Sequence, residues 1–130
     1  MRLEPYQRAF IMLWTLERAA DAVLTYHILG LGGVELNAIV RRVLEWAGRA
    51  EGLALWSMLT ITLGILLGIY LPAALEWGLR RARRLTSLEK AMIEAYGVRG
   101  ISKIILALAA VIGSTGPVLN ALCIMRAHMG

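Results

Sequence analysis

Apolar residues dominate two long stretches of the chain, and neither stretch contains an acidic or basic side chain. Residues 52–75 form a run of 24 such positions, and residues 104–125 form a run of 22. A bilayer core of about 30 Å requires about 20 apolar residues in a helix that rises 1.5 Å per residue. The pattern therefore predicts two membrane-spanning helices, at about residues 53–79 and 101–125.

A third apolar segment, at about residues 6–29, carries charged residues in its middle. Glu17, Asp21 and Thr25 recur every four residues and share one helix face, and Arg18 can pair with Asp21. An ionised group at a helix centre costs about 2.5–3.5 kcal/mol on insertion scales, so this stripe should face protein or water. A buried ion pair, a functional polar pocket and a charged band near one interface remain open as explanations.

Two shorter segments complete the predicted architecture. Residues 34–47 place apolar and polar side chains on opposite helix faces, but 14 residues reach only about 21 Å at 1.5 Å each. This segment is typical of an amphipathic helix at the membrane surface. Residues 80–100 are expected to form a cytoplasmic loop with a short helix. The predicted fold is thus an all-α membrane bundle with three transmembrane helices, forming a single domain over residues 1–130.

Small and polar residues inside the two apolar spans predict how they pack. Gly64 and Gly68 form a G-x-x-x-G pair, which lets another helix approach closely, either within the chain or in an oligomer. Residues 113–117 read Gly-Ser-Thr-Gly-Pro and predict a kink with freed carbonyl groups. Asn120 lies one turn beyond, and its amide should bond either to the first helix or to neighbouring backbone.

Composition agrees with a membrane protein and narrows the alternatives. Hydrophobic residues make up 58% of the chain, above the roughly 45–50% of a soluble domain. The single cysteine, Cys123, excludes an intrachain disulfide and a thiolate metal cluster. The first apolar segment lacks the features of a cleaved signal peptide. The net charge of +5 comes from residues that flank the spans, which fits lipid headgroups better than nucleic acid.

The distribution of basic residues predicts the orientation. Three spans put the N-terminus and the 80–100 loop on one side, and that side holds most of the Lys and Arg residues: Arg2, Arg8, Arg80, Arg81, Arg83, Arg84, Lys90, Arg99 and Lys103. The other side holds Arg41, Arg42, Arg49 and Arg126. The positive-inside rule predicts a cell-membrane protein with a cytoplasmic N-terminus and an external C-terminus. The run Arg80, Arg81, Arg83 and Arg84 is expected to set this topology or to contact lipid headgroups.

The candidate site is a polar cluster around the end of the first helix. Its core is Asp21, Thr25, Glu35 and Asn37, with Glu17, Arg18 and Asn120 as further members. Two carboxylates brought together by the Gly30–Gly33 turn could hold a cation, share a proton or bond to backbone ends. No metal-binding, nucleotide-binding or nucleophile motif is present, so we expect no cofactor and no metal, and the chain does not have the signature of an enzyme.

Part of this cluster resembles a known family. Asp21-x-x-x-Thr25, followed by Gly33-x-Glu35-x-Asn37 at the start of an amphipathic helix, is similar to the pattern of small prokaryotic multi-pass membrane proteins catalogued as domain of unknown function 5658. The resemblance covers about residues 10–48. The family usually has proline after the asparagine, where this chain has Ala38. The resemblance implies a retained polar motif in a membrane protein and supplies no activity.

Three functions fit the sequence. The first is a scaffold or subunit of a membrane assembly, either a homo-oligomer or part of a larger complex, in which the polar cluster is structural. The second is an ion or proton channel or transporter formed by an oligomer, with Asp21 and Glu35 along its path. The third is a metal-dependent, lipid-modifying membrane enzyme that uses the same carboxylates. Membrane lipid is the expected partner in each case, and nucleic acid is not.

Overall fold

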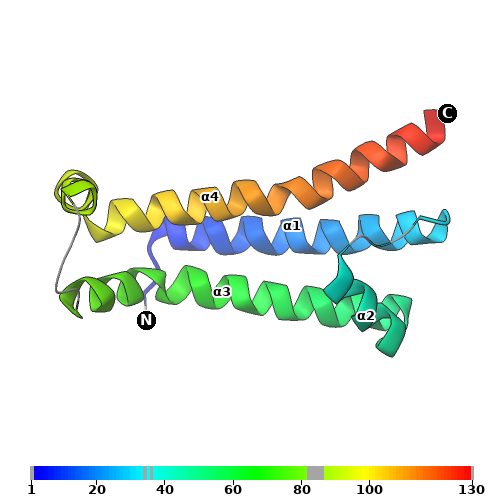
Figure 1. Cartoon of the computed structure of the whole chain (residues 1–130), viewed down its shortest axis with the longest axis horizontal. Helices are drawn as coiled ribbons and strands as arrows, with labels where there is room; N and C mark the ends of the chain where they lie inside the picture. Colours follow the sequence, from blue (N-terminus) through cyan, green and yellow to red (C-terminus); the bar gives the residue numbers. More distant parts are fainter. Residues whose placement is uncertain (1, 34, 36, 82–86, 130) are drawn as a thin grey trace.

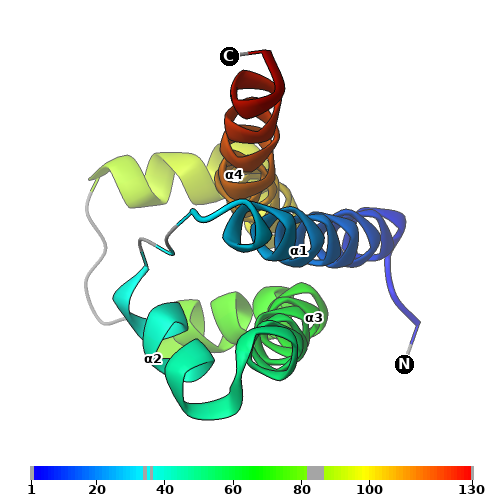
Figure 2. The same cartoon turned by 90° about the vertical axis from the view of Figure 1, so that its right-hand side faces the viewer.

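The computed structural model describes residues 2–33, 35, 37–81 and 87–129. Every regular element within these residues is a helix: α1 (Pro5–Gly30), α2 (Ala38–Ala47), α3 (Arg49–Arg81) and α4 (Ser87–Met129). The prediction of an all-α chain is confirmed. The three long helices lie side by side with α1 between α3 and α4 (Figure 1). The short helix α2 lies at the end of the bundle where α1 finishes (Figure 2).

Two of these helices, α3 and α4, are long and apolar enough to cross a membrane. Only 11% and 17% of the residues in their most apolar stretches are buried within the chain, whereas a core helix of a soluble domain would be mostly buried. Met58 on α3 and Ile112 on α4 illustrate this, since their side chains are 66% and 69% exposed. Most apolar side chains in these stretches are thus not buried against the rest of the chain.

The small interior of the bundle lies toward the start of α1. Phe10 packs there against Leu106 and Ala110 of α4, and all three are at most 7% exposed. Trp14 stacks on Phe10 with ring centroids 5.8 Å apart. This apolar cluster fills the bundle between its N-terminal end and the polar residues farther along α1.

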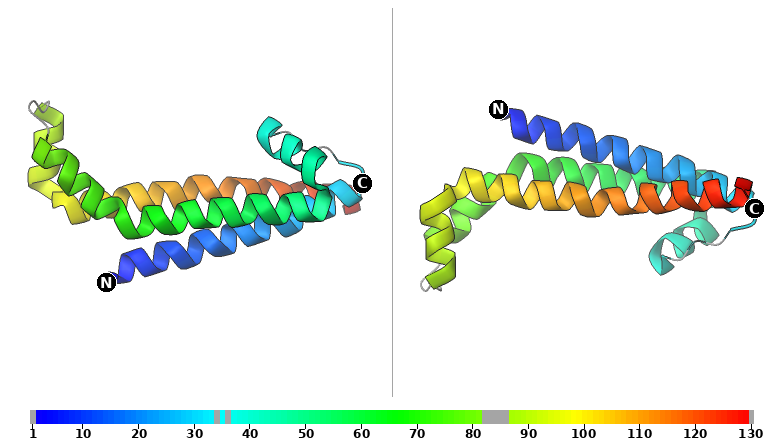
Figure 3. Two further views of the ribbon diagram at one scale, coloured as in Figure 1. Left: turned by 90° about the horizontal axis from the view of Figure 1, so that it is seen from below. Right: turned by 90° about the horizontal axis from the view of Figure 1, so that it is seen from above.

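The predicted break between a short helix and the last span is present inside α4, at Gly97. Residues 87–97 and 101–125 both belong to α4, and Gly97 alone departs from helical geometry, with φ 67° and ψ 176°. A positive φ of this kind is accessible to glycine without steric cost, so the chain changes direction without an intervening loop. The segment before Gly97 lies across the bundle axis, beside the end of α3 that follows Pro72 and also bends away (Figure 3).

The amphipathic helix is shorter than predicted. It starts at Ala38 and spans 10 residues, while Glu35 and Asn37 lie outside it in non-helical conformations. Val34, where the helix was expected to begin, is outside the described residues. Gly48, with φ 93°, separates α2 from α3. The α3 helix then begins at Arg49, four residues before the predicted start of the span at residue 53.

Candidate functional site

The polar face of α1 is hydrogen-bonded to α4. The side-chain amide nitrogen of Asn120 donates to Asp21 Oδ1 at 2.8 Å and to Thr25 Oγ1 at 3.0 Å. Thr25 is only 8% exposed. Of the two partners that the sequence allowed for Asn120, the structure shows the first helix. Asp21 and Thr25, which are about one turn of α1 apart, therefore both bind a single residue of α4.

Glycines on α4 allow this acidic stripe to approach the helix backbone. A Cβ atom at Gly113 would lie 2.7 Å from Glu17 Oε2, and one at Gly116 would lie 2.9 Å from Asp21 Oδ1. Both distances are too short for a side chain to be added without movement. Within the described residues, Glu17 Oε2 is buried and has no hydrogen-bond partner. The stripe predicted from the spacing of Glu17, Asp21 and Thr25 thus faces α4.

Arg18 replaces a backbone hydrogen bond that α4 lacks. Pro117 has no N–H group to donate to the carbonyl of Gly113 four residues earlier. The guanidinium of Arg18 donates to that carbonyl and also forms an ion pair with Asp21 at 3.9 Å. It lies 4.9 Å from the centre of the Trp14 ring. The freed carbonyl predicted at the 113–117 kink therefore finds its partner on α1.

Gln7 performs the same role for α3. Pro72 leaves the carbonyl of Gly68 without its helical donor, and the side-chain nitrogen of Gln7 donates to that carbonyl at 2.9 Å. The oxygen of the same side chain accepts from the backbone N–H of Glu4 at 2.8 Å, and Gln7 is 6% exposed. Sequence reasoning missed Gln7. The available signal was the carbonyl four residues before each proline, which needs an outside donor.

Trp14 sits between α3 and α4. Its indole N–H donates to the carbonyl of Thr60 at 2.9 Å, and a Cβ atom at Gly64 would overlap the indole ring. A Cβ atom at Gly68 would meet Phe10 and Ile11. The G-x-x-x-G face of α3 is therefore covered by α1 of the same chain, one of the two uses that the sequence allowed.

The Glu35 and Asn37 motif forms the start of α2. Asn37 Oδ1 accepts hydrogen bonds from the backbone nitrogens of Ile39 at 3.0 Å and Val40 at 3.3 Å, the geometry of a helix N-cap. Glu35 Oε1 in turn accepts from the backbone nitrogen of Asn37 at 2.9 Å. This arrangement explains why the helix begins at Ala38, because the side chain of Asn37 satisfies two of its first backbone donors and Glu35 binds the backbone N–H of Asn37 itself.

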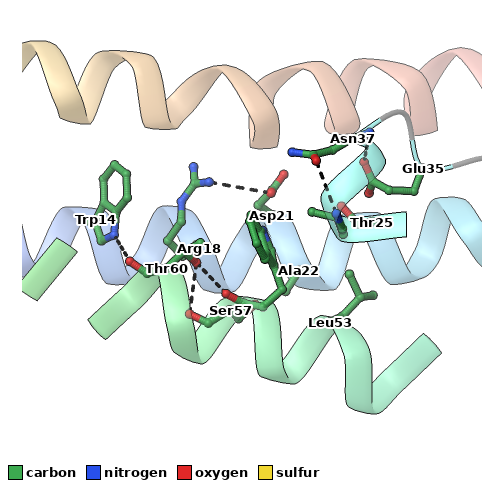
Figure 4. A pocket seen from close by; sticks show the side chains of 12 residues that line it. Trp14, Arg18, Asp21, Ala22, Thr25, Glu35, Asn37, Leu53, Ser57 and Thr60 are labelled. Atoms are coloured by element: carbon green, nitrogen blue, oxygen red, sulfur yellow. Dashed lines mark hydrogen bonds and ion pairs between the residues drawn. The ribbon is translucent and has the colours of Figure 1, made fainter. Parts of the chain in front are cut away.

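A cavity of about 220 Å³ brings most of the predicted cluster together (Figure 4). It lies between α1, α2, α3 and the segment that joins α1 to α2. Its polar lining residues are Arg18, Asp21, Thr25, Glu35, Asn37, Ser57 and Thr60, and its aromatic ones are Trp14 and Trp56. Asp21 and Glu35 thus line one cavity, although each accepts its hydrogen bond from a different partner.

Sequence reasoning did not find the α3 side of this cavity. Ser57 and Thr60 lie within an apolar run, and Trp56 lies near the start of the predicted span, where a tryptophan is typical of an interface anchor. The three residues and Leu53 recur every three or four positions and so share a helix face. The spacing predicts that these residues lie on one face of the helix, but it does not predict which other helix packs against that face.

Arg80 and Arg81, two of the four residues predicted to contact headgroups, lie at the opposite end of the molecule, at the end of α3. Arg80 pairs with Glu76 on the exposed surface of α3, and the guanidinium of Arg81 lies 4.5 Å from the centre of the Trp77 ring. Arg83 and Arg84 are outside the described residues. Contact of this run with lipid stays a prediction.

Among residues 2–33, 35, 37–81 and 87–129, no three His, Cys, Asp or Glu side chains lie close enough together to hold a metal ion.

No protein-family model, curated protein or solved structure matches the chain. The resemblance to domain of unknown function 5658 therefore stays a prediction.

Proposed function

We propose that the chain is a small multi-pass membrane protein that acts as a scaffold or subunit of a membrane assembly. In this proposal α1, α3 and the part of α4 after Gly97 each span the bilayer. One observation carries the proposal: Gln7, Trp14, Arg18 and Asp21 of α1 are hydrogen-bonded to α3 or α4, while most of the apolar residues of α3 and α4 are not buried within the chain. This distribution suits lipid as the surrounding solvent.

The charged residues of α1 support its place as the third span. In hydrocarbon, an unsatisfied polar group costs several kcal/mol, so a charged helix must be shielded by its neighbours. Because α1 lies between α3 and α4, its Arg18 and Asp21 side chains are turned toward protein partners. Its 26 residues give a length of about 39 Å at 1.5 Å per residue, enough for a bilayer.

The proposed orientation has the N-terminus in the cytoplasm and the C-terminus outside. The start of α1 lies at the same end of the bundle as Arg80, Arg81, Arg99 and Lys103, whereas α2 lies at the other end (Figure 1). The excess of basic residues on the first end supports this orientation under the positive-inside rule. Trp46 of α2 is 83% exposed and suits an outer interface.

Extraction of the tagged chain from its native membrane into polymer nanodiscs tests the scaffold proposal. Mass measurement of the discs should show a stoichiometric companion, either a second copy or a larger protein. Reconstituted liposomes should leak protons and small cations no faster than empty liposomes. A chain recovered alone, together with ion flux that Glu35→Gln abolishes, would contradict the proposal.

A channel or transporter is the second candidate, and the polar cavity favours it. Asp21 and Glu35 line that cavity near the end of the bundle that carries α2. The apolar cluster of Phe10, Leu106 and Ala110 fills the bundle beyond Trp14, so a path within one chain would be closed. A channel would then need an oligomer with its path between copies. No observation favours the lipid-modifying enzyme.

A further inference from the structure

Glu35 borders two cavities that differ in the charge of their other lining residues. The first is the cavity already described, which Glu35 shares with Asp21, Trp14 and Trp56. The second has a volume of about 300 Å³ and is lined by Leu29, Gly33, Glu35, Arg41, Leu44, Glu45 and Arg49. We propose that the two cavities together bind a primary ammonium group joined to a phosphate by a short linker, as in phosphoethanolamine.

The first cavity suits the ammonium group. Its charged side chains are Arg18, Asp21 and Glu35. Arg18 forms an ion pair with Asp21 and donates to the Gly113 carbonyl of α4, so the charge of Glu35 is left without a compensating charge in the lining. Carboxylate oxygens accept the N–H groups of a primary ammonium in strong, charge-assisted hydrogen bonds. The indole ring of Trp56 also lines the cavity, and indole faces attract cations.

The second cavity suits the phosphate. Arg41 comes from α2 and Arg49 from the start of α3, so two elements each contribute an arginine to the lining of one cavity. Among the described residues, neither guanidinium forms an ion pair with a carboxylate. Arginine donates paired N–H groups that match phosphate oxygens. Glu35 and Glu45 also line this cavity, but the ammonium group would balance the charge of Glu35, and the two arginines then outweigh Glu45.

The size and place of the cavities agree with such a ligand. At about 30 Å³ per water molecule, 220 Å³ is the space of about seven waters, enough for an aminoethyl group. Glu35 belongs to both linings, so a short linker suffices to join the two charges. Both cavities adjoin α2, at one end of the bundle. If the chain spans the membrane as proposed, this end lies in the headgroup region. The lipid form of the ligand therefore rests on the proposed function.

Binding to the purified full chain in a neutral detergent tests the site. The probes are O-phosphoethanolamine, dihexanoyl phosphatidylethanolamine, dihexanoyl phosphatidylglycerol and ethanolamine, with titration calorimetry and tryptophan fluorescence as readouts. We expect one or both phosphoethanolamine probes to bind at least about tenfold more tightly than the other two, because only they carry both charges. Preference for the free compound or for the lipid identifies the source of the ligand.

Three variants and one matched control locate the site. Glu35→Gln, Arg41→Gln and Arg49→Gln should each weaken binding by about tenfold or more. Arg42→Gln removes the neighbouring charge on α2, which lines neither cavity, and should change affinity less than about twofold. Circular dichroism checks that each variant retains its helices.

Two results would overturn the site: equal affinity for phosphatidylglycerol and phosphatidylethanolamine, or an Arg42→Gln loss as large as that of Arg41→Gln. Either would indicate general attraction to anions. The free probe requires no membrane, so this test is independent of the nanodisc experiment. A chain that stays soluble without detergent would contradict the proposed membrane position while leaving the binding result to stand.

Discussion

Two proline residues each remove one backbone hydrogen bond, and side chains of α1 supply both replacements. Gln7 donates to the carbonyl that Pro72 leaves free on α3, and Arg18 donates to the one that Pro117 leaves free on α4. An unsatisfied buried carbonyl costs about 1–3 kcal/mol. The prolines thus create acceptors that only a correctly placed α1 can satisfy, which makes them determinants of helix pairing.

A double-mutant cycle on Gln7 and Pro72 tests this relation. Gln7→Leu should lower the free energy of unfolding by about 1–3 kcal/mol, because the Gly68 carbonyl then loses its donor. In a Pro72→Ala background the helix supplies its own N–H, so the same change should cost at least about 0.5 kcal/mol less. Denaturant titration in micelles measures both values. Equal costs in the two backgrounds would show that Gln7 acts independently of the proline.

Gly64 is a second position where a single added carbon atom should disrupt the packing of α1 on α3. Gly64→Ala places a methyl group inside the Trp14 indole and should cost about 1–3 kcal/mol of unfolding free energy. Gly78→Ala is the matched control on the same helix, since a Cβ atom there has no neighbour within 4 Å. The control should be neutral or slightly stabilising in the same titration. A Gly64→Ala protein as stable as the control would refute close packing of α1 on α3.

Helix boundaries were predicted well where a strong local signal exists. Residues 6–29 match α1 closely, because Pro5 suits a first helical position and the Gly30–Gly33 segment permits a reversal. The break at Gly97 was also predicted, whereas the start of the amphipathic helix was not. That helix begins at Ala38 because the side chain of Asn37 caps it, and the sequence alone did not show that Asn37 takes this role.

The start of α2 depends on Asn37, and this dependence is measurable. Asn37→Ala removes the acceptor for two backbone donors and should cost about 0.5–2 kcal/mol, while Asn37→Asp should retain most of the stability. Hydrogen exchange of the Ile39 and Val40 amides reports the effect locally. Unchanged protection in Asn37→Ala would contradict the capping role.

At the scale of the whole molecule, the bundle places its polar groups inside and its apolar groups outside. The membership of the polar cluster was largely predictable, because charged residues in an apolar helix must find protein or water. Their partners were not. Asp21 and Asn120 are separated by 99 residues, and only the arrangement of α1 against α4 brings them together. The α3 residues of the cavity were hidden for the same reason.

The central claim is that the polar stripe of α1 holds the bundle together, and a double-mutant cycle on Asp21 and Asn120 tests it most directly. Unfolding is measured in micelles for Asp21→Ala, Asn120→Ala, the double variant and the control Thr115→Ala, whose hydroxyl bonds only within α4. We expect Asp21→Ala and Asn120→Ala each to lower the free energy of unfolding by about 1–3 kcal/mol. The double variant should lose at least about 0.5 kcal/mol less than the sum of the two single losses, and the control should be nearly neutral. Single variants as stable as the wild type would contradict the claim and would indicate that these groups are kept for a function other than folding.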